Sequence, residues 1–209
     1  MSHSAQSTTS NAHEVARLRS AVRTVGLANL GYFGIEFAVA TAIGSVALFA
    51  DSIDFLEDAA LNGLILIGLY WTARARARLG MTLAAVLLIP GVATLWSAWH
   101  AWNLGHFPAP TPLTLAGLGA LIVNVGCAAL LARVRHVQGS LTRAAFLSAR
   151  NDAVANIAIV AAGFVTAMTH SLWPDLVVGL GIFLMNLDAA REVYTAARAE
   201  HAQADAPAP

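Results

Sequence analysis

Residues 45–62 read SVALFADSIDFLEDAALN and place four acidic side chains, Asp51, Asp54, Glu57 and Asp58, at the start of a long apolar run. At about 100° per residue, Asp51, Asp54 and Asp58 fall within roughly 60° of one another on a helix, whereas Glu57 lies about 60° beyond that stripe. A carboxylate in a hydrocarbon layer is costly unless it meets a cation, a proton or water. No Lys or Arg occurs in this stretch. The aligned carboxylates therefore indicate a site for a metal cation.

The composition of the rest of the chain is typical of a membrane protein. Of its 209 residues, 57% are hydrophobic and 11% are charged, whereas soluble domains contain about a quarter charged residues. Apolar runs long enough to cross a bilayer, about twenty residues, recur along the chain. We therefore predict an all-α, multi-pass integral membrane protein without a soluble domain.

Six transmembrane helices are predicted from the apolar runs. They cover about residues 22–43, 46–72, 79–102, 113–132, 144–168 and 175–195. Together they form one six-span transporter domain over residues 22–197. The polar residues 1–21 are expected to be a disordered tail, and residues 198–209 a second short tail.

The basic residues predict the orientation of these helices. All twelve are Arg, and eleven lie near the start of the first span, near the end of the sixth, or in the second-to-third and fourth-to-fifth connections. By the positive-inside rule both termini and these two connections are cytoplasmic. We expect the protein in the inner membrane of a bacterium.

A second polar helix face lies in the fifth predicted span. Ser148, Asp152 and Asn156 share a stripe of roughly 80°, Asn151 flanks it, and Arg150 points to nearly the opposite side. Hard divalent metals favour carboxylate oxygen, and a protonated carboxyl group binds metal poorly. Metal and protons would therefore compete for the same atoms. The alternative interpretation is a set of protonated carboxyl groups that hydrogen-bond between helices.

The stretch GSVALFADSIDFLED resembles the second-span motif of the cation diffusion facilitator family of divalent-metal efflux transporters. In this resemblance Asp54 and Asp58 stand on the two metal-ligand positions of the motif. The stretch LSARNDAVAN is similar to the family's fifth-span motif and puts Asp152 on its second ligand position. Glu36 also matches an acid typical of the first span.

The sequence departs from the family pattern in two places. Ser148 occupies the first ligand position of the fifth span, where the family has His or Asp. The fourth ligand position is then open to water, Asn151 or Asp51. Many members also carry a soluble metal-binding domain after the sixth span. Because this chain ends shortly after that span, the resemblance implies a form without the domain.

The resemblance implies a secondary active transporter that exports a divalent metal from the cytoplasm in exchange for protons. It favours zinc, with manganese, iron, cobalt and cadmium as alternatives.

The competing interpretation is a membrane metal-binding or regulatory protein that does not transport. No H-E-x-x-H, Walker or G-x-S-x-G pattern occurs, so we expect neither an enzyme nor a cofactor. The expected partners are the metal, protons, the lipid bilayer and a second copy in a homodimer formed through the transmembrane helices. We do not expect nucleic acid as a partner.

Overall fold

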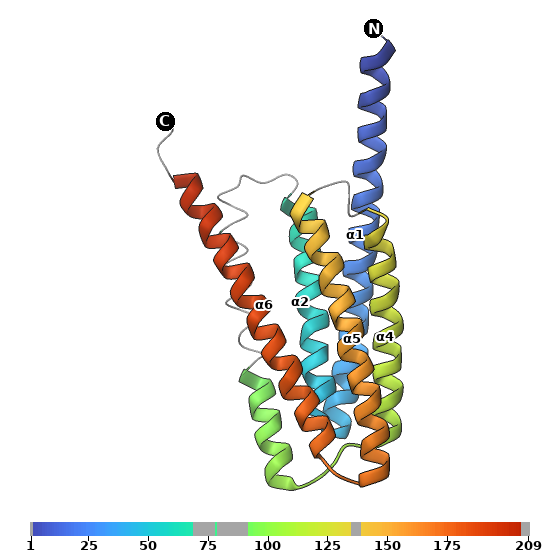
Figure 1. The fold of residues 1–209 in the computed structure, drawn as a ribbon, viewed down its shortest axis with the longest axis vertical. Coiled ribbons are helices and arrows are strands. Elements are labelled where there is room, and N and C mark those ends of the chain that lie inside the picture. Colours follow the sequence, from blue (N-terminus) through green and yellow to red (C-terminus); the bar gives the residue numbers. More distant parts are fainter. Residues whose placement is uncertain (1, 69–77, 79–91, 135–138, 206–209) are drawn as a thin grey trace.

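The computed structural model describes residues 2–68, 78, 92–134 and 139–205, and these residues contain helices but no strand. The prediction of an all-α protein is thus confirmed. The labelled helices in Figure 1 are α1 (Ser2–Ile43), α2 (Val46–Gly68), α4 (Pro110–Ala132), α5 (Gly139–Thr169) and α6 (Trp173–Asp205). Residues 92–104 form a further helix. The predicted second and third spans lie partly outside the described residues, at 69–72 and 79–91.

The helix that carries the acidic stretch is central to the bundle. Helix α2 contacts α1, α4, α5 and α6, and α6 is inclined to the other four (Figure 1). Both termini lie at the same end of the bundle (Figure 1). At the opposite end, Ala98 of the helix at 92–104 packs with Val46 of α2 and Leu176 of α6. The side chains of the acidic stretch are therefore surrounded by four helices.

A glycine sets the turn between α1 and α2. Gly44 has a φ of 69°, a left-handed conformation that glycine adopts without a steric penalty. The Ser45 N–H then donates to the Ala40 carbonyl at 3.0 Å, as in a Schellman ending. Ser45 also begins the next helix, because its Oγ accepts the Leu48 N–H at 3.1 Å. This tight turn places α1 and α2 side by side.

The N-terminal segment differs from its prediction. Helix α1 begins at Ser2, so the expectation of a disordered tail over residues 1–21 is wrong in its conformation. The physical reason is that the segment contains several Ala and Arg residues together with Gln, Glu and Leu, all of which favour helix. No Gly or Pro interrupts the chain before Gly26.

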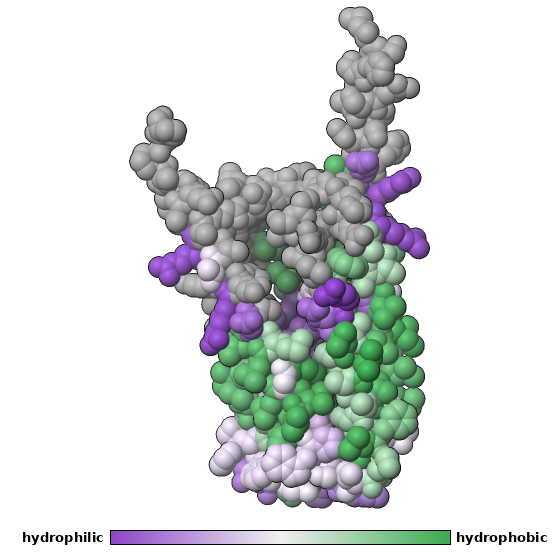
Figure 2. Space-filling view, in the orientation of Figure 1, coloured by the Kyte–Doolittle hydropathy of each residue, from purple (hydrophilic) through white to green (hydrophobic). Residues whose placement is uncertain are grey.

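The surface of the described part of the chain suits a membrane. Hydrophobic residues form a band across the visible face in Figure 2, bordered by hydrophilic residues on the side of the termini. By length and apolar composition, three of the described helices could cross a bilayer, over Glu14–Ile43, Pro110–Ala132 and Ser148–Thr169. Helix α2 differs from these because it carries four acidic residues. Trp102 and Trp173 pair edge to face at 5.1 Å, at the end where an aromatic belt is expected.

Candidate metal site

Asp58 is held from two sides. It lies on α2 and is buried. Ser148 Oγ of α5 donates to its Oδ1 at 3.0 Å, and Asn29 Nδ2 of α1 donates to its Oδ2 at 3.3 Å. Each carboxylate oxygen therefore has a neutral donor from a different helix, which fixes the orientation of the side chain without neutralising its charge.

The other two predicted acids lie next to Asp58. The carboxyl group of Asp152, on α5, lies beside those of Asp54 and Asp58. Asp152 is 7% exposed, and its Oδ2 has no hydrogen-bond partner among the described residues. Asp54 is half-buried. The fold thus brings together the three acids that the sequence singled out, two from α2 and one from α5.

The charge of this cluster is not offset by the nearest arginine in the sequence. Arg150 is exposed and donates to Asn151 Oδ1 at 3.3 Å, so it points away from the acids. Carboxyl groups lie side by side only when a proton or a cation offsets their charge. Within the described ranges, no three His, Cys, Asp or Glu side chains are arranged to hold a metal ion as they stand. The three acids are gathered but do not enclose an ion.

The structure separates the candidates for the fourth ligand. Ser148 contacts Asp58 directly. Asn151 is exposed and paired with Arg150, so the structure does not bring it to the acids. Asp51 lies three residues before Asp54 on α2 and belongs to a second polar cluster. There its Oδ2 accepts a hydrogen bond from Asn156 Nδ2 at 2.6 Å.

Sequence reasoning missed two asparagines at this site. Asn29 is buried and holds Asp58. Asn186 of α6 is 3.1 Å from Asp54 Oδ1 when its amide is oriented to donate both there and to the Ile182 carbonyl. The available signal was a lone amide in each apolar span, because an unpaired polar side chain in a membrane needs a partner on another helix.

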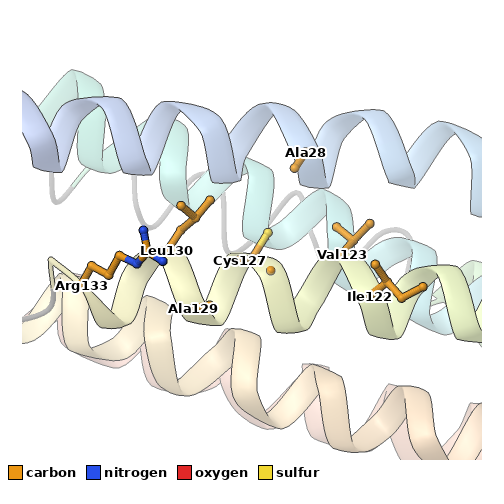
Figure 3. A pocket seen from close by; sticks show the side chains of 8 residues that line it. Ala28, Ile122, Val123, Cys127, Ala129, Leu130 and Arg133 are labelled. Carbon is orange, nitrogen blue, oxygen red and sulfur yellow. The ribbon is translucent and has the colours of Figure 1, made fainter.

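An open apolar groove runs between α1 and α4 on the outside of the bundle (Figure 3). It has a volume of about 390 Å³ and is lined by Ala28, Ile122, Val123 and Leu130, with Arg133 toward one end. The thiol of Cys127 also borders it, and Cys127 Sγ donates to Asn29 Oδ1 at 3.5 Å. Asn29 therefore links Cys127, at the border of the groove, to Asp58.

Comparison with protein families gives an independent result. Residues 22–198 match the model of the cation efflux transmembrane domain. A comparison with curated proteins gave no match. The matched segment includes every acid of the candidate site.

Proposed function

Because the chain belongs to the cation efflux family, whose members are transporters and not enzymes, we propose that it exports a divalent metal from the cytoplasm in exchange for protons. It is a membrane transporter of metal cations. The specific metal, the exchange with protons and the residues that bind the metal form the proposal.

One observation carries the proposal: three acids from two helices meet inside the bundle, and the nearest arginine points away. Asp54, Asp58 and Asp152 supply oxygen donors that suit hard or borderline divalent cations. Zinc is the favoured metal, with manganese, iron, cobalt and cadmium as alternatives. Ser148 adds a hydroxyl group at the edge of the same cluster. The metal enters as the transported substrate.

Proton exchange follows from the chemistry of the ligands. A carboxylate must lose its proton before it binds metal well, so metal and protons occupy the same oxygen atoms in turn. An acidic outer solution would return protons to the site after the metal leaves. No further domain is needed for this coupling.

The arrangement in the membrane is part of the proposal. Both termini lie at one end of the bundle (Figure 1), and eleven of the twelve arginines lie near the termini or in connections expected at that end. This distribution supports a cytoplasmic location of the termini. We place the protein in the inner membrane of a bacterium as a homodimer formed through its transmembrane helices.

The test is transport by the purified protein in sealed vesicles that contain a zinc-sensitive dye and a pH-sensitive dye. Zinc entry with opposite proton movement is the expected result. Asp58→Asn and Asp152→Asn should each lower zinc flux by about tenfold or more, since each removes one of three anionic ligands. Asp188→Asn is the matched control, because Asp188 is exposed on α6. Normal flux in Asp152→Asn would show that the two-helix site is wrong. Tight binding without flux would favour the non-transporting alternative.

A further inference from the structure

Glu36 and Asp51 form a buried pair of acids that the proposed site does not use. Glu36 lies on α1 and Asp51 on α2, and both are 0% exposed. Their carboxyl groups lie beside each other. Both oxygens of Glu36 and the Oδ1 of Asp51 have no hydrogen-bond partner among the described residues. Apart from the contact between the two carboxyl groups themselves, these three buried oxygens thus receive no hydrogen bond from the described residues.

The neighbouring polar groups leave these oxygens unoccupied. Asn156 donates only to the other oxygen of Asp51, and Asn124 Nδ2 donates to Asn156 Oδ1 at 3.0 Å, which holds that amide in place. The Tyr32 hydroxyl donates to the Ala116 carbonyl at 2.6 Å. No Lys, Arg or His occurs between residues 24 and 73, the part of the chain that contains both acids. The pair therefore leaves three carboxyl oxygens that no neighbouring amide or hydroxyl group of the described residues occupies.

The pair lies on one side of the three-acid site. Asp51 precedes Asp54 by three residues and Asp58 by seven, which is about 4.5 Å and about 10 Å along a helix. It is nearer the start of α2, at the end of the bundle opposite the termini (Figure 1). With cytoplasmic termini, a cation that left Asp54, Asp58 and Asp152 for the outside would move toward this pair.

We propose that Glu36 and Asp51 form a second site for a divalent cation, distinct from the three-acid site, which receives the metal on its way out. The inference rests on the proposed function, because the cation is the same. Two carboxylates match the charge of a dication, and their oxygen donors suit manganese as well as zinc. Asn156 holds the Oδ2 of Asp51, which leaves the Oδ1 of Asp51 for the ion. Water would complete the coordination shell.

The test isolates the second site by neutralising the first. Asp54→Asn, Asp58→Asn and Asp152→Asn are combined in one chain, which keeps side-chain size but removes the three charges. Binding of Mn²⁺ to this chain in lipid nanodiscs is measured by electron paramagnetic resonance. The expected result is one residual Mn²⁺ site per chain. Adding either Glu36→Gln or Asp51→Asn should weaken the residual binding at least tenfold. Adding Glu57→Gln, which removes a charge from the same helix outside the pair, should change it less than twofold.

Two results would overturn the inference: no residual Mn²⁺ binding, or residual binding that survives Glu36→Gln. The first would mean that the pair holds a shared proton instead of a metal. If the chain with all three substitutions does not fold, the inference is tested instead by the zinc flux of chains that carry a single substitution at Glu36. Glu36→Gln should then lower the maximal rate at least fivefold with less than a twofold change in the half-saturating zinc concentration, and Glu36→Asp should restore part of the rate. An unchanged maximal rate in Glu36→Gln would overturn the inference.

These outcomes separate the second site from the proposed function. If the native chain shows no zinc flux but the triple variant binds Mn²⁺ through Glu36, the transport proposal fails and the second site stands. If flux is normal and the triple variant binds nothing, only the second site fails.

Discussion

Asp175, in the first turn of α6, accepts a hydrogen bond from Ser45 Oγ at 2.5 Å, although 129 residues separate the two in sequence. The other oxygen of Asp175 accepts the Val46 N–H at 2.7 Å. An anion at the start of a helix satisfies free N–H groups and interacts favourably with the helix dipole. One helix of the bundle therefore caps the helix that carries the acids of the site.

Removing this cap should lower stability. We expect Asp175→Ala to reduce the free energy of unfolding by about 1–3 kcal/mol, since a buried hydroxyl and backbone N–H groups lose a charged acceptor. Asp175→Asn should lose less, because its carbonyl can still accept one bond. Thermal melting in detergent measures the effect. Asp188→Ala, an exposed position on the same helix, is the control, and equal melting temperatures for Asp175→Ala and the control would contradict the prediction.

Close packing of α6 on α2 can be tested with a pair of glycines. An added Cβ at Gly179 would lie 2.7 Å from Ala47 N and from the Val46 carbonyl carbon, which are backbone atoms that cannot move aside independently. Gly179→Ala should therefore cost about 1–3 kcal/mol through overpacking. Gly181→Ala, two residues further along, meets nothing within 4 Å and should be tolerated. Similar melting temperatures for the two variants would show that the helices can separate without cost.

Ser148 is the position at which the site departs from the family motif. Replacing it with His or Asp should tighten metal binding by about tenfold, a typical size for a partner in a metal site. His should also favour zinc over manganese, because imidazole suits zinc and manganese prefers oxygen. Titration of both metals against the native chain and the two variants measures the change. If neither affinity moves, Ser148 does not belong to the site.

The proposed exchange predicts a definite response to pH. Because bound metal and bound protons exclude each other on the same carboxylates, metal affinity should fall as the pH falls. Binding should release more than one proton per metal ion near neutral pH. Calorimetric titration in buffers with different ionisation enthalpies counts these protons. A count of zero would contradict the exchange mechanism and leave a uniporter or a binding protein.

The sequence predicted the helices and the acids because both leave local patterns. Apolar runs mark transmembrane helices, and Asp54 and Asp58 share a face by their spacing alone. Asp152 was identified in the same way, because it shares a helix face with Ser148 and Asn156. In the structure the carboxyl group of Asp152 lies beside those of Asp54 and Asp58, and their role as metal ligands stays a prediction.

The partners of these acids could not be predicted, because they depend on packing between distant segments. Asn29 precedes Asp58 by 29 residues, and no periodic pattern connects them. The sequence shows that Asp175 lies at the start of its own helix. It does not show that Asp175 accepts hydrogen bonds from the start of α2. The helical start of α1 was missed for a different reason: polar composition suggested disorder, whereas helix propensity favours continuation of α1.

The position of Cys127 has a practical consequence. It is the single cysteine of the chain, it is 2% exposed, and it borders the groove between α1 and α4 (Figure 3). Its thiol contacts Asn29, which in turn contacts Asp58. A thiol-reactive fluorophore would therefore label one place only, and only when α1 and α4 part. The native chain carries its own reporter of helix separation beside the site, with no engineered cysteine.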